Sequence, residues 1–197
     1  MGRSKQLSDE ALLQAARETF VAEGFGASTR EVARRAGISE AVLYQRYQTK
    51  IDLFFAAMIP PPIELAAGRS GRGLVADLGA LAVEIMAYFR GAMPVLLQLV
   101  THPSFNLADL RDRESRMPLH RLGEAVTACL ERHRRQGAIT ADADRIMTAT
   151  LTLVATLHSL ALFERMGVHG GAFPDQAVKN VVALIAAGLT SKKGRGK

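Results

Sequence analysis

The most constraining feature of the sequence is a pair of short helical patterns within residues 28–47, separated by one glycine. The first starts at Ser28, where Glu31 completes the spacing of a capping box, and it ends at Gly37. The second follows Ser39, a good N-cap, and is too short to be stable alone. Two short helices joined by a tight glycine turn have the spacing of a helix-turn-helix.

The second of these helices, from Glu40 to Tyr47, has only two or three inward apolar positions. Its remaining positions point away from the small core and are Glu40, Ala41, Val42, Gln45 and Arg46. A DNA major groove accepts one helix, and Arg, Gln and small apolar groups read base edges there. The sequence therefore predicts that this helix is presented to duplex DNA.

The charge of this segment supports the same prediction better than the charge of the whole chain. The net charge is +6, but the last six residues alone carry four basic side chains. Between Ser28 and Lys50 there are five basic and two acidic side chains, a local excess of three positive charges. A basic face of this kind can neutralise phosphates.

The rest of the chain indicates an all-α fold of about nine helices, because helix formers dominate and no segment alternates like a strand for long. We expect an N-terminal three-helix helix-turn-helix domain at 1–55, a helical effector-binding and dimerisation domain at 56–190, and a disordered basic tail at 191–197. The expected linker begins at three consecutive prolines, Pro60–Pro62, and continues through the glycines up to Gly73. The expected helices run from Ser8 to Glu23, from Thr29 to Ala36, from Glu40 to Tyr47, from Lys50 to Ile59, from Leu74 to Arg90, from Pro94 to Thr101, from Leu107 to Arg116, from Pro118 to Gln136, from Asp142 to Met166, and from Pro174 or Asp175 to Leu189.

Residues 27–54 also resemble the DNA-binding domain of the tetracycline-repressor (TetR/AcrR) family. The strongest marks are Ala36-Gly37-Ile38-Ser39, Leu43-Tyr44, Tyr47-Gln48-Thr49-Lys50 and the following Leu53-Phe54, with Phe20 and Gly24-Phe25 in the first helix. Three positions depart from the family pattern: Tyr47 where Phe is commoner, Ala41 where Gly or Pro is frequent, and Val42 in place of a small polar residue. The operator sequence is therefore out of reach of inference.

The resemblance implies roles by position. Tyr44 and Thr29 would bond backbone phosphates, and Lys50 would place its charge and the N-terminus of its helix on the phosphates. A second group would face the bases or nearby phosphates: Arg30, Glu40, Ala41, Val42, Gln45 and Arg46. The full set of expected DNA-binding residues is Thr29, Arg30, Ser39, Glu40, Ala41, Val42, Tyr44, Gln45, Arg46, Tyr47 and Lys50. A plainer interpretation stays open, in which Arg34 and Arg35 simply form a solvated face and Tyr44 is a core residue.

Residues 146–163 contain no Asp, Glu, Lys or Arg. This uncharged segment is just long enough to suggest a membrane span. Four threonines, Ser159 and His158 argue against a span and favour a helix that is buried on two sides. In the resembled family the last two helices of each subunit form an intersubunit four-helix bundle. The resemblance thus implies that the chain pairs with a second copy through its last two helices. We expect no membrane as a partner.

Dimerisation needs only the last two helices, so the helices from Leu74 to Gln136 need another role, and they carry flexible methionines and aromatic rings. The candidate buried polar side chains are Glu84, His102, His120 and His158. This mixture suits an adaptable apolar pocket, although a lone histidine is usually a hydrogen-bonded core residue. The expected ligand-binding residues are Leu81, Ile85, Met86, Phe89, Met117, His120, Leu151 and His158.

The sequence thus predicts a cytoplasmic, ligand-responsive regulator, a repressor that binds a palindromic operator as a homodimer and is released by a small apolar effector. A regulator without effector and an activator of the same fold stay open. An enzyme is not expected, because no nucleophile–base pair or phosphate loop is present. One cysteine and five scattered histidines predict no metal site and no cofactor.

Overall fold

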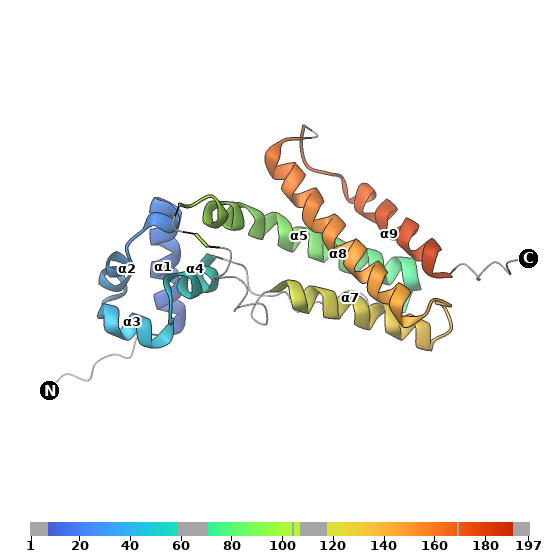
Figure 1. Cartoon of the computed structure of the whole chain (residues 1–197), viewed down its shortest axis with the longest axis horizontal. Helices are drawn as coiled ribbons and strands as arrows, with labels where there is room; N and C mark the ends of the chain where they lie inside the picture. The colour runs from blue at the N-terminus through green and yellow to red at the C-terminus, as the bar shows by residue number, and fades with distance from the viewer. Residues whose placement is uncertain (1–7, 59–70, 104, 107–117, 169, 191–197) are drawn as a thin grey trace, which may run out of the picture. The chain divides into compact units, whose positions relative to one another are not determined.

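The computed structural model describes residues 8–58, 71–103, 105–106, 118–168 and 170–190 (Figure 1). These residues form eight α-helices and one 3₁₀ turn, and none of them forms a strand, so the predicted all-α fold is confirmed. The chain divides into two compact units. The first unit comprises Met1–Pro61 with Pro94–Leu107, and the second comprises Pro62–Met93 with Ala108–Lys197. The predicted domain limits at residues 55 and 190 stay predictions.

The first unit contains α1 (Asp9–Glu23), the 3₁₀ turn η1 (Gly24–Gly26), α2 (Thr29–Ala36), α3 (Glu40–Arg46) and α4 (Lys50–Met58). Each of the first three helices begins at a serine whose hydroxyl accepts a backbone N–H. Ser8 accepts from Ala11, Ser28 from Arg30 and Ser39 from Val42. These three helix starts, expected from the capping pattern, are therefore correct.

A cluster of phenylalanine rings forms the centre of the first unit. The Phe54 ring of α4 contacts Phe20 of α1 and Phe25 of η1 edge to face, with ring centroids 5.0 and 5.1 Å apart. The Arg17 Nε–H of α1 also donates to the Ala57 carbonyl of α4 over 2.8 Å. Since all three rings are buried, α1, η1 and α4 form a closed platform on which α2 and α3 pack.

The long helix α5 (Leu74–Val100) corrects one expectation, because the sequence suggested a break before Pro94 and a new helix after it. Proline lacks the N–H that an interior helical position donates, and its ring crowds the carbonyl four residues earlier. Here the helix continues through Pro94. Burial of Met93, Val95 and Leu99 around this position outweighs the cost of one lost hydrogen bond.

The second unit contains the first twenty residues of α5 together with α7 (Pro118–Arg135), α8 (Ala143–Met166) and α9 (Asp175–Thr190). In Figure 1, α8 (orange) and α9 (red) run antiparallel, and α7 packs against α8. Gly167 ends α8 in the left-handed conformation at φ 70°. The backbone N–H groups of Thr140 and Ala141 donate to the Leu189 carbonyl, which fixes the end of α9.

Two ion-pair groups hold the second unit together. Asp77 of α5 is fully buried, and its Oδ2 lies 3.1 Å from both Arg132 and His133 of α7. The Arg90 guanidinium of α5 binds the Glu164 carboxylate of α8 through two hydrogen bonds of 2.8 and 2.9 Å. Both groups join helices that are far apart in sequence, so the local sequence patterns could not predict them.

Two of the described helices, α5 and α8, are long and apolar enough to cross a membrane by length and composition. Core helices of globular proteins pass the same test, and half of the most apolar stretch of α5 is buried inside its own chain. In α8 only a third of that stretch is buried. The helix expected at 107–116 and the basic tail expected to be disordered at 191–197 lie outside the described residues.

Candidate functional site

The turn between α2 and α3 is built by Gly37, which adopts φ 69° and ψ 29°, a left-handed conformation that side chains other than glycine rarely adopt. The Gly37 N–H donates to the Arg34 carbonyl, and the Ile38 N–H donates to the Ala33 carbonyl over 3.0 Å. These bonds close the C-terminus of α2 and turn the chain directly into the Ser39 cap of α3. The helix-turn-helix geometry predicted for residues 28–47 is present.

One buried side chain, Leu43, anchors α3 on the first unit. Because the helix has only seven residues, most of its surface faces outward. Ala41, Tyr44 and Gln45 are exposed, and so is the Ser39 cap, while Glu40, Val42, Arg46 and the following Tyr47 are half-buried. The predicted recognition face therefore consists of accessible side chains on a helix that the platform holds in place.

The N-termini of α2 and α3 are joined by a hydrogen-bond network that the sequence did not predict. The Thr29 hydroxyl donates to the Glu40 carboxylate over 2.6 Å, so the Tyr44 hydroxyl, 3.1 Å away, donates to the Thr29 oxygen. The Arg30 Nε lies 3.9 Å from the same carboxylate, although its side chain is 87% exposed. This network fixes the orientation of both hydroxyls that the resemblance assigns to phosphate contacts.

The arginines of this region fall into two groups. Glu31 accepts hydrogen bonds of 2.7–2.8 Å from Arg34 and Arg35, and these bonds lower the pKa of Glu31 to about 2, with Arg34 as the largest cause. Arg46 of α3 forms a 2.8 Å ion pair with Asp9 of α1. Arg34 and Arg35 thus form the solvated face of the plainer interpretation, and Arg46 has an intramolecular partner 37 residues away that no local pattern could reveal.

Lys50 stands at the N-terminus of α4, where Thr49 and Asp52 cap the helix reciprocally. The Thr49 hydroxyl accepts the Asp52 N–H over 3.1 Å and donates to the Asp52 carboxylate over 2.7 Å. The Lys50 ammonium lies 4.8 Å from the centre of the Phe25 ring, and burial lowers the pKa of this ammonium. The charge of Lys50 is therefore held against an aromatic face at the predicted phosphate-binding helix end.

The comparisons with known proteins agree with this geometry. Residues 12–57, from α1 to α4, match the profile of the family described as bacterial regulatory proteins, tetR family. By this match residues 12–57 form a tetR-family helix-turn-helix DNA-binding domain. No curated protein sequence matches the chain significantly.

Solved structures resemble this chain over nearly its whole length. A protein of unknown function from Rhodococcus sp. RHA1 is 20% identical, with a TM-score of 0.66 over 96% of this chain and 100% of that one. The transcriptional regulator FadR from Bacillus subtilis, solved in complex with stearoyl-CoA, is 18% identical, with a TM-score of 0.65 over 92% and 100% of the two chains. The TetR-family regulator PfmR from Thermus thermophilus is 19% identical, with a TM-score of 0.54 over 90% and 97%. At these identities the likeness shows the fold.

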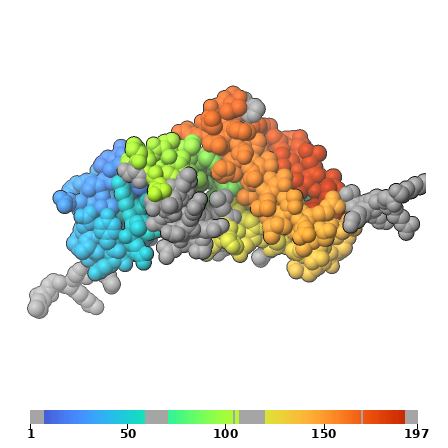
Figure 2. Space-filling model, viewed as in Figure 1, coloured from blue at the N-terminus to red at the C-terminus, as the bar shows by residue number. Residues whose placement is uncertain are grey.

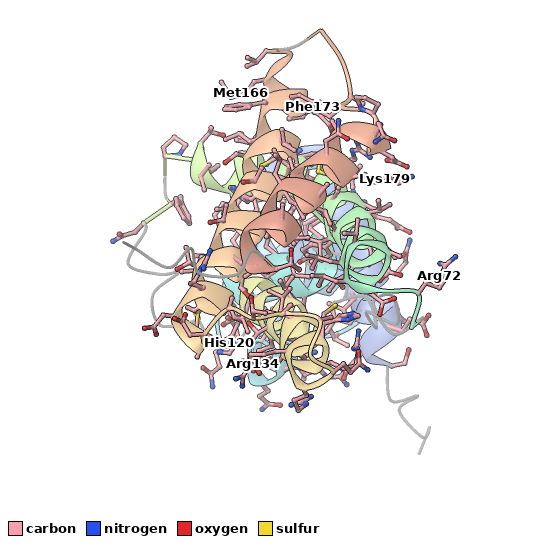
Figure 3. All side chains as sticks on the ribbon, turned by 90° about the vertical axis from the view of Figure 1, so that its right-hand side faces the viewer. Arg72, His120, Arg134, Met166, Phe173 and Lys179 are labelled. Carbon is pink, nitrogen blue, oxygen red and sulfur yellow. The ribbon has the colours of Figure 1, made fainter. Side chains whose placement is uncertain are left out.

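The residues predicted to bind an effector are only partly brought together. Four of them are buried in α5, namely Leu81, Ile85, Met86 and Phe89. The His158 ring of α8 packs edge to face on Phe89, with centroids 5.3 Å apart, and burial lowers the pKa of this histidine. His120 and Leu151 are exposed, and Figure 3 shows His120 at the periphery of α7. Met117 lies outside the described residues.

A groove of about 640 Å³ lies elsewhere in the second unit, between the start of α5 and the end of α9. Its walls include Arg72, Leu74, Val75, Ala183, Ala186 and Thr190. None of the described residues among the predicted effector contacts lines this groove, so the predicted effector site stays a prediction.

Proposed function

We propose that this chain is a repressor that binds a palindromic operator as a homodimer and is released by a small, largely apolar effector in the cytoplasm. The observation that carries the DNA-binding part is the accessible face of α3, held on a closed aromatic platform beside Lys50. A short helix that is anchored by one leucine and leaves Ala41, Tyr44 and Gln45 exposed suits insertion into a major groove.

The side chains divide into those that would position the protein and those that would read sequence. Tyr44, Thr29 and Lys50 would contact phosphates, since they lie at helix N-termini or beside them. Arg30 and Gln45 are the exposed polar side chains long enough to reach base edges. Ser39, Ala41, Val42 and Tyr47 would line the groove wall, and Arg46 would contact DNA only after leaving Asp9.

The test is to select bound sequences from random duplex DNA and then measure affinity at several salt concentrations. Lys50→Ala should weaken binding to all sequences alike and lower the salt slope by about one. Tyr44→Phe should also weaken binding uniformly. The matched control is Lys179→Ala, an exposed lysine of α9, which should change neither quantity. If Lys50→Ala leaves the salt dependence of the DNA affinity unchanged, the N-terminus of α4 does not contact the phosphates.

The homodimer part of the proposal rests on the uncovered apolar side chains of α8 and α9. Met147, Leu151 and Leu184 are 54%, 63% and 76% exposed in the single chain. In the view of Figure 2, α8 runs along the surface of the molecule. A soluble chain rarely leaves so many large apolar groups uncovered, and a second copy of the same two helices would cover them.

The effector part rests on the chemistry inside the second unit. Phe89 of α5 packs on His158 of α8, and Oε2 of Glu84 is buried without a hydrogen-bond partner in the described part of the chain. A ligand with an apolar body and one donor group would satisfy that oxygen. Because the FadR neighbour was solved with stearoyl-CoA, fatty acyl-CoA thioesters are the first class to test.

The effector test is a thermal-stability screen of acyl-CoA thioesters and apolar metabolites, followed by DNA binding in the presence of each hit. Stabilisation together with loss of DNA affinity supports a released repressor. Stabilisation with increased DNA affinity would favour the activator, and the absence of any stabilising ligand would favour a regulator without effector.

A further inference from the structure

The end of α5 and the turn after it belong to the first unit, and they place His102 against the DNA-binding helices. The His102 N–H donates to the Leu99 carbonyl over 3.1 Å, and its own carbonyl accepts the Phe105 N–H over 2.9 Å. The backbone at His102 is thus fixed on both sides, so its imidazole ring leaves a defined point of the chain.

This imidazole packs on the 3₁₀ turn that joins α1 to α2. Its ring meets the Phe25 ring edge to face, with centroids 5.1 Å apart and an interplanar angle of 80°. Its Nε2 lies 3.5 Å from the position that a Cβ on Gly26 would occupy, which is van der Waals distance, so the imidazole lies close to Gly26. The turn therefore provides an aromatic face and an open backbone for His102.

Phe25 contacts Lys50 as well as His102. The ring is 5% exposed, and three groups surround it: the His102 imidazole, the Phe54 ring and the Lys50 ammonium. A ring that is packed on several sides cannot tilt freely. A lysine side chain has many rotamers, and a fixed aromatic face reduces the conformational entropy that must be lost when its ammonium meets a phosphate.

We propose that His102 is a positioning residue for DNA binding, which orders Lys50 through the Phe25 ring without touching DNA itself. The inference rests on the proposed function for its affinity readout, and the arrangement of the three side chains can be measured without DNA. His102 acts by ring packing, so an aromatic replacement preserves the effect and a polar replacement of similar size does not.

The experiment is a double-mutant cycle on the full chain, measured by fluorescence anisotropy with a duplex taken from the selection. The variants are His102→Gln, His102→Phe, Lys50→Ala and the double variant Lys50→Ala/His102→Gln. Val100→Ala, at an exposed position of the same helix end, is the matched control. His102→Gln should weaken binding roughly 2- to 5-fold, the fold-change of a lost cation–π arrangement, and reduce the salt slope. His102→Phe and Val100→Ala should bind like the wild type.

In the Lys50→Ala background, His102→Gln should cause no further loss. An equal loss in both backgrounds, or no rescue by His102→Phe, would overturn the proposal and leave His102 a structural residue.

If the wild type binds no duplex DNA, the proposed function fails, and an NMR spectrum of the free protein still tests how His102, Phe25 and Lys50 are arranged. The Lys50 side-chain protons should show upfield ring-current shifts that decrease in His102→Gln and persist in His102→Phe. Lys50 shifts that are identical in all variants would also overturn it.

Discussion

The two units place their large apolar side chains differently. In the helices α1–α4, Leu12, Phe20, Leu43 and Phe54 are fully buried, and Val21 and Tyr44 are the large exposed exceptions. In α8 and α9, by contrast, Met147, Leu151, Phe163, Met166 and Leu184 are all exposed. Figure 3 shows Met166 at the end of α8.

This difference indicates which unit is complete within one chain. The first unit satisfies its apolar groups with its own ring cluster and satisfies most of its arginines with neighbouring carboxylates. The second unit pairs the carboxylates of Asp77 and Glu164 with basic side chains, but it leaves large apolar side chains of α8 and α9 exposed. We infer that the first unit buries its core and supports α3 without a partner. The second unit requires a further molecule to bury its exposed apolar side chains.

The largest expected effect tests whether the first unit depends on its own core. Phe54→Ala removes the ring that joins Phe20 to Phe25 and should cost about 3–5 kcal/mol. Hydrogen exchange of the α1–α4 amides measures this loss locally. Phe55→Ala, at the half-exposed edge of the same cluster, is the control and should cost much less. Equal losses for both variants would mean that the ring cluster is not the centre of this unit.

The next prediction tests whether the apolar surface of the second unit is covered by a second copy. Leu151→Glu should raise the dimer dissociation constant roughly 100-fold, since it buries an unpaired charge at the proposed interface. Sedimentation velocity measures the change. Val21→Glu, at a position 67% exposed in α1, introduces the same charge outside the interface and should leave assembly unchanged. A Leu151→Glu chain that assembles like the wild type would place the interface elsewhere.

A smaller effect separates base-reading side chains from solvated ones. Arg30→Ala and Gln45→Ala should each relax base preference at one position per half-site, by about 1–3 kcal/mol. Arg34→Ala is the control, because Glu31 binds that guanidinium, and it should leave the preference unchanged. Binding assays with single-base variants of the selected site measure this. Uniform weakening at every base would reassign Arg30 or Gln45 to the phosphates.

The smallest effect concerns the pH dependence of the second unit. The hydrogen bonds from Arg90, and then that from the Phe173 N–H, hold the pKa of Glu164 below its ordinary value of 4.5. A depressed carboxyl pKa contributes stability above the ordinary pKa, and this contribution is lost as the pH falls through the folded value. Glu164→Gln should therefore cost about 1–2 kcal/mol at neutral pH and flatten the loss of stability below about pH 4.5. Acid titration followed by circular dichroism measures it, with exposed Glu18→Gln as the control, and an unchanged acid slope would contradict the assignment.

Much of the fold followed from local signals in the sequence. The serine caps, Gly37 and Gly167 lie where capping chemistry requires them, and helix ends depend mainly on neighbouring residues. Pro94 misled the prediction because the cost of an interior proline was weighed without the burial of the residues around it. Tertiary packing decided that position.

The candidate site was less predictable in its contacts than in its location. The exposure of Gln45 and Arg30 followed from helical spacing. The partners of Thr29 and Arg46 did not, because Glu40 and Asp9 reach them only in the folded chain. The contact between the Lys50 ammonium and the Phe25 ring was not predictable either, because it depends on η1 lying beside the start of α4 in the folded chain.

The central claim is that α3 docks in the major groove as one half of a two-fold pair. The most direct measurement is the affinity and stoichiometry of the full chain on the selected duplex as the spacing between half-sites varies. The account predicts two chains per site and a strong loss of affinity when about half a helical turn of DNA is inserted, because two recognition helices then face opposite sides of the duplex. Equal affinity for one half-site and for all spacings would contradict it.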